Sequence, residues 1–144
     1  MITALDTSVL LDLFTDDPKF RDRSLSAIRR CLADGPLVAC DVVWAEVVAT
    51  FPDALTATRA LGGIPVEYSG LDARSASRAG TIWRGYRQRG GARERVVADF
   101  LIAAHAKEHA DRLLTRDRGF HGAAFAGLTI LDPSVGIPDS AGRD

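Results

Sequence analysis

The chain has 144 residues, a length that fits one domain and leaves little room for a second. Hydrophobic residues make up 47% and charged residues 26%, an ordinary balance for a soluble globular protein. The formal net charge is −1, so a surface that binds nucleic acid must come from local segregation of charge. No apolar run approaches the roughly 18 residues of a membrane helix, and the N-terminus lacks the basic and apolar stretches of a secretory signal. We therefore expect a cytoplasmic protein with no membrane partner.

Short apolar runs alternate with helical patterns along the chain. The strands are expected at residues 2–5, 37–40, 65–69, 112–115 and 128–131. The helices are expected at residues 7–14, 18–34, 53–61, 71–88 and 94–109, with Pro18 opening the second and glycine pairs ending others. A further helix, which Asp41 can cap, carries Val42, Val43, Val47 and Val48. Such alternation predicts a three-layer α/β/α sandwich with a mostly parallel central sheet. The domain is expected to span residues 1–132, and residues 133–144, rich in Pro, Gly, Ser and Asp, to form a loose tail.

The two cysteines, Cys31 and Cys40, lack the Cys-x-x-Cys spacing of a metal or redox motif. We interpret them as buried, reduced thiols of a cytosolic protein, and a disulfide between them stays an open alternative.

Two aspartates follow predicted strands, where parallel sheets bind their ligands. Asp6 comes directly after the first strand, and Asp117 lies two residues beyond the fourth. The carboxyl ends of parallel strands meet at one edge of the sheet, so both side chains are expected there. Taken singly, Asp6 could cap the following helix, and Asp117 could be an ordinary turn residue.

Two further acids interrupt apolar helix faces. Glu46 shares a face with Val43 and Val47, and Asp99 shares one with Val96 and Phe100. A buried carboxylate needs an arginine, backbone donors or a metal ion, because burial without a partner costs several kcal/mol. Either acid alone could pair with an arginine. Four acids converging from two strand ends and two helices predict a shared cation site.

Several segments in order resemble one family, the PIN-domain nucleases, and among them the VapC-type toxins of bacterial toxin–antitoxin pairs. The resemblance covers residues 2 to about 132 and rests on Leu5–Leu10, Glu46, Ala98–Ala106 and Leu114–Phe120. It implies a metal-dependent endoribonuclease, a homodimer and a VapB-like antitoxin partner. By position, the family's catalytic acids correspond to Asp6, Glu46, Asp99 and Asp117. Thr7 and Thr115 match hydroxyl positions that line such sites.

Carboxylates of this number suit Mg²⁺ or Mn²⁺, because four of them without a cation would repel one another and raise their own pKa values. We expect Asp6 and Asp99 to be the principal ligands, Glu46 to ligate or to orient the attacking water, and Asp117 to complete the site. Some relatives carry another carboxylate near Gly119, which this chain lacks, so one or two ions remain open.

An arginine-rich segment precedes Asp99. Residues 74–95 contain seven arginines, and Trp83 and Tyr86 lie among them. We hypothesise that Arg84, Arg87 and Arg89 contact RNA phosphates and that an aromatic ring stacks on a base. The alternative is a solvated helix face with Trp83 in the core.

One motif and the fold itself also allow other functions. Residues 105–109 read His-x-x-Glu-His, a zinc-protease pattern, but no later glutamate supplies a third ligand. An RNA-processing nuclease that is not a toxin, or a PIN-like binding module without catalysis, would share the fold; a binding module would be expected to lose acids. Apolar side chains at Trp44, Val48 and Phe51 could bind an amphipathic antitoxin helix, or they could lie in the core.

Overall fold

A parallel sheet of five strands forms the centre of the molecule. The computed structural model describes residues 1–91 and 97–135. The strand order is β3-β2-β1-β4-β5, and every neighbouring pair is parallel. The strands are β1 (Thr3–Leu5), β2 (Leu37–Cys40), β3 (Val66–Ser69), β4 (Arg112–Leu114) and β5 (Ile130–Leu131). The parallel sheet expected from the sequence is confirmed.

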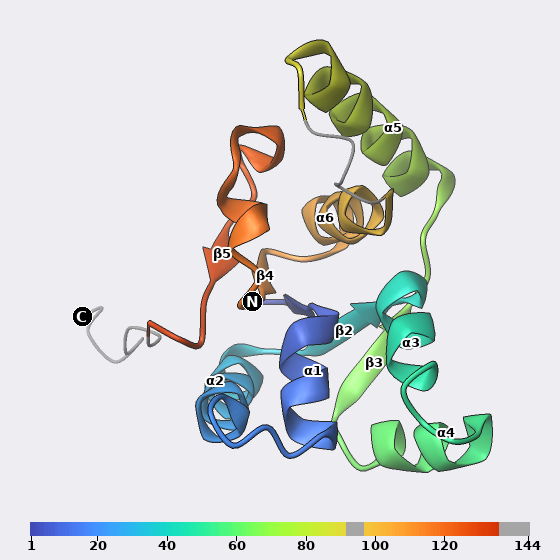
Figure 1. The fold of residues 1–144 in the computed structure, drawn as a ribbon, viewed down its shortest axis with the longest axis vertical. Coiled ribbons are helices and arrows are strands. Elements are labelled where there is room, and N and C mark those ends of the chain that lie inside the picture. Colours follow the sequence, from blue (N-terminus) through green and yellow to red (C-terminus); the bar gives the residue numbers. More distant parts are fainter. Residues whose placement is uncertain (92–96, 136–144) are drawn as a thin grey trace.

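Within the described residues, six α-helices and two short 3-10 helices connect these strands. They are α1 (Thr7–Phe14), α2 (Arg21–Asp34), α3 (Asp41–Val48), α4 (Ala54–Gly62), α5 (Ala73–Gln88), α6 (Val97–His109), η1 (Arg118–His121) and η2 (Ala123–Phe125). The chain moves outward from β1 through β2 to β3, and then returns past β1 to β4 and β5. Because parallel crossovers are right-handed, this reversal places the two groups of helices on opposite faces. Figure 1 shows α1 and α2 on one side of the sheet and α5 and α6 on the other, which confirms the three-layer sandwich.

The reversal also defines where a ligand can bind. Strand β1 lies between β2, reached by a crossover on one face, and β4, reached by a crossover on the other. Loops leaving the carboxyl ends of such neighbours diverge and leave a crevice. The ends of β1 and β4 therefore form the expected position of a site in this fold.

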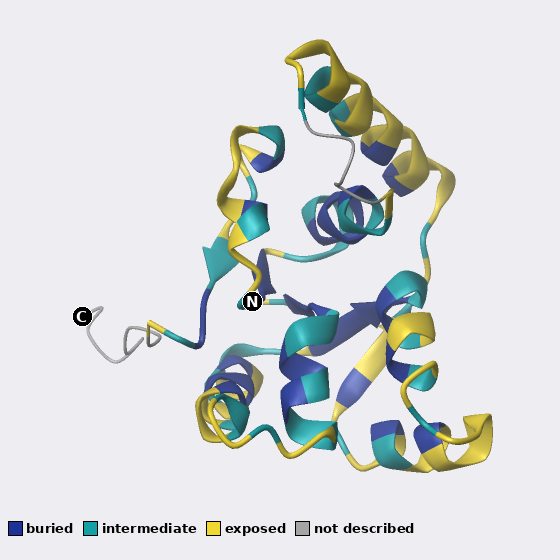
Figure 2. Ribbon diagram, viewed as in Figure 1, coloured by how far each residue is buried: buried dark blue, intermediate teal, exposed yellow. Residues whose placement is uncertain are grey.

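The core lies between the sheet and both helix layers. All residues of β1, β2 and β4 are buried, whereas β3 and β5, at the sheet edges, are partly exposed. Figure 2 shows the buried residues on the central strands and on the inward faces of the helices. A strand covered on both faces is apolar almost throughout, which explains the short hydrophobic runs that predicted these strands.

Several element boundaries differ from the expectation. Helix α2 begins at Arg21 rather than Pro18, because the Asp17 carboxylate accepts the backbone N–H groups of Lys19 and Phe20 and forms a turn there. Strand β5 has two residues rather than four. The helices η1 and η2 were not predicted. Residues 94–96, expected to begin the last α-helix, lie outside the described residues.

Cys31 and Cys40 are both free and buried, as interpreted from the sequence, and burial raises the pKa of each thiol. Within residues 1–91 and 97–135, no helix is long and apolar enough to cross a membrane. Of the predicted tail, residues 136–144 lie outside the described residues.

Candidate active site

Asp6 lies where the carboxyl ends of β1 and β4 meet, at the reversal of strand order. It follows β1 directly, and its backbone N–H donates to the carbonyl oxygen of Leu114 at 3.0 Å. Its carboxylate accepts hydrogen bonds from the hydroxyls of Thr115 (2.6 Å) and Ser8 (3.0 Å). The side chain makes no capping hydrogen bond to α1, although Asp6 stands at the N-cap position. The capping alternative is therefore wrong for Asp6, whose carboxylate points to the end of β4.

Burial makes the charged form of Asp6 unfavourable. The residue is 5% exposed, and this burial raises its pKa above the ordinary value of 3.8. The hydrogen bonds from Thr115 and Ser8 partly offset the rise, and the charge of Asp117 adds to it. A cation at this point would favour the carboxylate form.

Asp117 lies on the loop after β4, beside Thr115. Its backbone N–H donates to the Thr115 hydroxyl at 3.0 Å, and its carboxylate accepts the backbone N–H of Gly119 at 2.8 Å. Asp117 thus has the turn role weighed as the alternative, since it caps η1. The Thr115 hydroxyl, which accepts from the backbone of Asp117, also donates to Asp6, so both aspartates lie where β1 and β4 end.

Glu46 reaches the site through Thr7. Its carboxylate accepts a hydrogen bond from the Thr7 hydroxyl at 2.9 Å, which ties α3 to the residue that follows Asp6. The expectation that Glu46 is buried on an apolar face is wrong: Val43 and Val47 are buried, but Glu46 is exposed. Glu46 therefore lies at the exposed border of the apolar face of α3.

Asp99 stands in the first turn of α6 and is half-buried, while Phe100 beside it is fully buried. Helix α6 packs against β1 and α3, the elements that carry Asp6 and Glu46. Val96, which was expected to share the face of Asp99, lies outside the described residues.

The four acids do not converge as one ready-made ligand set. In the part of the chain that the structure describes, no three Asp, Glu, His or Cys side chains are arranged to ligate one metal ion. Asp6 and the backbone of Asp117 share the Thr115 hydroxyl, Glu46 is bonded to Thr7, which follows Asp6, and Asp99 lies on α6, which packs against β1 and α3. The oxygen chemistry fits a hard cation, because Mg²⁺ keeps several of its waters and binds carboxylates through them as well as directly.

Sequence reasoning missed three residues around this site. The Ser8 hydroxyl donates to Asp6 and accepts the backbone N–H of Arg116 at 3.3 Å. The Arg116 guanidinium binds Asp12 of α1 with contacts as short as 2.7 Å, and Asp12, which is 1% exposed, also accepts from Ser24 at 2.6 Å. Asp12 interrupts the apolar face of α1, the same signal that selected Glu46 and Asp99.

The zinc-protease pattern does not form a metal site. The Nε2 atom of His105 lies 2.9 Å from the Ser69 hydroxyl, and burial lowers the pKa of His105. Glu108 pairs with Arg78, and His109 lies 3.0 Å from Asp72. His105 thus joins α6 to β3, and Glu108 and His109 join α6 to α5 and its N-cap residue.

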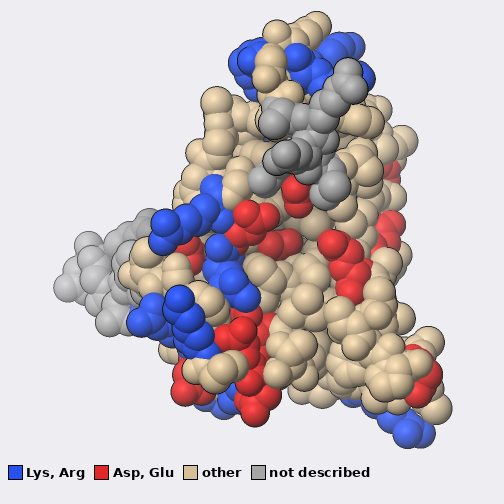
Figure 3. All heavy atoms as spheres, viewed as in Figure 1, with Lys and Arg blue, Asp and Glu red and all other residues tan. Residues whose placement is uncertain are grey.

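Residues 74–88 of the arginine-rich segment lie in α5, whose far end carries a basic patch at the top of Figure 3. Arg84, Arg87 and Arg89 are exposed. Trp83 stacks on Phe100 with ring centroids 6.2 Å apart, and the Arg87 guanidinium lies 4.9 Å from the Trp83 ring. Trp83 contacts these two side chains but is 37% exposed, so the alternative that placed it in the core is wrong. Arg93 and Arg95 lie outside the described residues.

Solved structures with a similar fold include chains of toxin–antitoxin complexes. A chain of VapBC2 from Rickettsia felis, solved with a promoter DNA fragment, has a TM-score of 0.74 at 20% identity, over 92% of this chain and 98% of that one. A chain of VapBC-1 from nontypeable Haemophilus influenzae has a TM-score of 0.71 at 21% identity, over 93% and 99%. VapC20 of Mycobacterium tuberculosis, described as a sarcin–ricin loop cleaving toxin, has a TM-score of 0.54 at 16% identity, over 83% and 95%.

Among curated protein sequences, none is significantly similar to this chain. The family model of the PIN domain, however, matches residues 3–126. This range includes strands β1 to β4 and all four candidate acids. The chain therefore belongs to the PIN-domain family.

Proposed function

We propose that this chain is a metal-dependent endoribonuclease and the toxin of a toxin–antitoxin pair. The observation that carries the proposal is the buried Asp6 at the reversal of strand order, held by Ser8 and Thr115 beside the carboxylate of Asp117. Membership of a family of nucleases supports a nuclease, and the neighbour VapC20, described as cleaving the sarcin–ricin loop, supports RNA as substrate.

Asp6 and Asp99 would be the principal ligands of Mg²⁺ or Mn²⁺, with Asp117 and Glu46 bound directly or through water. An ion held by these residues would act as a Lewis acid on the phosphate and would lower the pKa of a water bound to it. Ser8 and Thr115 orient the Asp6 carboxylate, because both hydroxyl hydrogens point to the same oxygen, Oδ2. Thr7 fixes Glu46, which can then orient the attacking water and accept its proton.

The test is cleavage of RNA by purified protein with Mg²⁺ or Mn²⁺, by its Asp99→Asn variant, and after treatment with EDTA. We expect wild-type cleavage to stop with EDTA and Asp99→Asn to be inactive but folded. Mn²⁺ should also raise the melting temperature of the wild type, by the equivalent of about 2.7 kcal/mol at a hundredfold excess over Kd. Wild-type rates in Asp99→Asn, or undiminished cleavage after chelation, would exclude the mechanism.

We further propose a VapB-like antitoxin partner that acts in the cytosol with the toxin, and a toxin homodimer. The structural neighbours VapBC2 and VapBC-1 are toxin–antitoxin complexes, which supports such a partner. Trp44, Val48 and Phe51 are half-buried and pack against the core. Beside them, Tyr68 is 56% exposed and stacks edge-on against Trp44 at 5.4 Å. An amphipathic helix of the antitoxin would cover this apolar surface.

A further inference from the structure

A basic pocket opens beside the loop that carries Thr115 and Asp117. Its volume is about 260 Å³, and Lys19, Phe20, Arg23, Arg116 and Arg118 line it together with residues 134–135. No acidic side chain is among its lining residues. In Figure 3, basic side chains gather next to acidic ones on the central left of the face shown.

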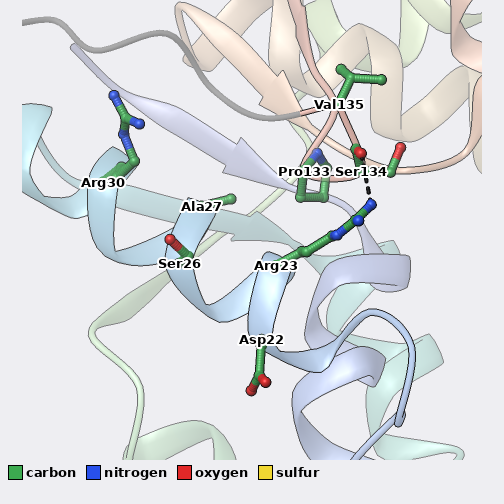
Figure 4. A pocket seen from close by; sticks show the side chains of 8 residues that line it. All are labelled: Asp22, Arg23, Ser26, Ala27, Arg30, Pro133, Ser134 and Val135. Carbon is green, nitrogen blue, oxygen red and sulfur yellow. Dashed lines mark hydrogen bonds between the residues drawn. The ribbon is translucent and has the colours of Figure 1, made fainter.

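Two of the four cations are already used by the protein. The Arg116 guanidinium binds the buried Asp12 and lies 4.2 Å from the centre of the Phe20 ring. Arg23 donates to the carbonyl oxygen of Ser134 at 2.9 Å, as Figure 4 shows in the adjoining cavity of about 550 Å³. Both groups shape the wall of the pocket.

Lys19 and Arg118 are the other two cations, and neither forms an ion pair with another described residue. The Lys19 ammonium lies 5.0 Å from the centre of the Phe20 ring. The nearby acids have other partners: Asp17 accepts two backbone N–H groups, and Asp132, which lines a neighbouring hollow with Arg118, accepts from Ser134. By contrast, Arg21 pairs with Asp16 at 2.9 Å. Two cations thus face a pocket where an external anion can neutralise them.

The pocket and the candidate acids share one loop. Arg116, in the pocket wall, donates its backbone N–H to Ser8, and Ser8 donates to Asp6. Arg118 follows Asp117 in sequence. If the reacting phosphate of an RNA strand lies at Asp6, the neighbouring phosphates are repelled by the carboxylates there. The basic pocket is the adjacent cationic surface that can bind one of them.

We propose that the basic pocket binds a phosphate of the RNA backbone next to the scissile one, through Lys19 and Arg118. The inference rests on the proposed ribonuclease function and names residues that this function does not require. It differs from the hypothesis for Arg84, Arg87 and Arg89, which lie toward the end of α5, the helix that Figure 1 shows outside α6 and away from the sheet.

The experiment measures binding of a labelled single-stranded RNA over a series of KCl concentrations, in EDTA and in an Asp6→Asn background that prevents cleavage. The pocket variant is Lys19→Ala with Arg118→Ala. The charge-matched control is Arg29→Ala with Arg59→Ala, two exposed arginines on α2 and α4. The rival variant carries alanine at Arg84, Arg87 and Arg89.

Each lost phosphate contact lowers the slope of log affinity against log salt by about 0.7 for a single strand. Both cations bind the same phosphate in this proposal, so we expect a decrease of about 0.7 in the pocket variant and none in the control. An unchanged slope in the pocket variant overturns the proposal. If the pocket variant also fails to bind the proposed VapB-like antitoxin while its slope is unchanged, the pocket belongs to that protein partner instead. If the wild type neither binds nor cleaves RNA, the proposed function itself fails, and this outcome is distinct from failure of the pocket variant alone.

Discussion

At the scale of single residues, the site depends on how two hydroxyls are placed. Thr115 donates its only hydroxyl hydrogen to Asp6 and accepts the backbone N–H of Asp117; Ser8 does the same with Asp6 and Arg116. These hydrogen bonds attach Asp6 to the loop after β4, and the groups that form them are hydroxyls rather than cations. A buried carboxylate in such surroundings is an unfavourable group until a cation arrives.

We predict that Asp6→Asn stabilises the metal-free protein above acidic pH. The folded-state pKa of Asp6 is raised, so its contribution to stability is greatest at low pH and is lost as pH rises from 3.8 through the folded value. Asparagine keeps the shape and has no charge to desolvate. The melting temperatures of wild type and variant in EDTA should therefore be similar near pH 4 and diverge as pH rises, with the variant higher.

The control for this comparison is Asp22→Asn, a change at an exposed acid in the first turn of α2. Parallel pH profiles for wild type and Asp6→Asn would show that burial of the Asp6 charge does not influence stability.

At the scale of elements, the loop between β4 and η1 is fixed from α1 and α2. Asp12 of α1 binds the Arg116 guanidinium, and Ser24 of α2 donates to the same carboxylate. Arg116 stands between Thr115 and Asp117 in the sequence. Its ion pair with Asp12 therefore holds the loop that carries both residues and anchors the segment in which Thr115 binds Asp6.

We predict that Asp12→Asn destabilises the fold and lowers cleavage. Removing one partner of a buried ion pair costs about 3–5 kcal/mol, and the low end applies because the Arg116 side chain remains 30% exposed. For a chain of this size, a loss of about 3 kcal/mol lowers the melting temperature by roughly 6–12 °C. Thermal unfolding and the cleavage rate at 20 °C below the midpoint measure the two effects separately.

The matched control is Asp16→Asn, which removes a partner of Arg21 at a side chain that is 86% exposed. Exposed ion pairs contribute about 1 kcal/mol or less, so this variant should melt close to the wild type. Equal melting temperatures for the two variants would rule out the anchoring role of Asp12.

At the scale of the whole molecule, the charges are segregated although the net charge is only −1. Acids gather where β1 and β4 end, and basic groups gather in the pocket at Lys19 and on the end of α5 (Figure 3). An apolar surface at Trp44 and Tyr68 lies on α3 and β3. These three surfaces correspond to the reaction, the substrate and the partner of the proposed function.

For the partner, we predict that expression of the chain alone arrests bacterial growth and that Asp6→Asn relieves the arrest. Co-expression with the neighbouring gene should give a stable complex, because a free ribonuclease requires an inhibitor. Trp44→Ala should weaken the complex by removing apolar contact area, and circular dichroism would check its fold. Harmless expression of an active nuclease with no recovered partner would instead indicate a role in RNA processing.

Much of the fold was predictable, because local patterns carry it. The apolar runs at residues 2–5, 37–40 and 112–115 became the buried central strands, since a strand covered on both faces has few polar residues. The start of α2 was misplaced because a side-chain turn at Asp17 competes with the helix that Pro18 could begin. The helices η1 and η2 were missed because they are shorter than a helical period can reveal.

By itself, the sequence determined the layer architecture and the position of Asp6 and Asp117 at one edge of the sheet. The reason is that parallel strands run in the same direction, so their carboxyl ends lie at the same edge. Only the tertiary structure decided how the site is held. The hydrogen bonds of Thr115 and Ser8 to Asp6 join residues that are 109 and 2 positions apart, and the Asp12–Arg116 pair spans 104. It also showed Glu46 exposed yet bound to Thr7. Periodicity reports which face of a helix is apolar, but the neighbouring elements decide which positions on that face meet solvent.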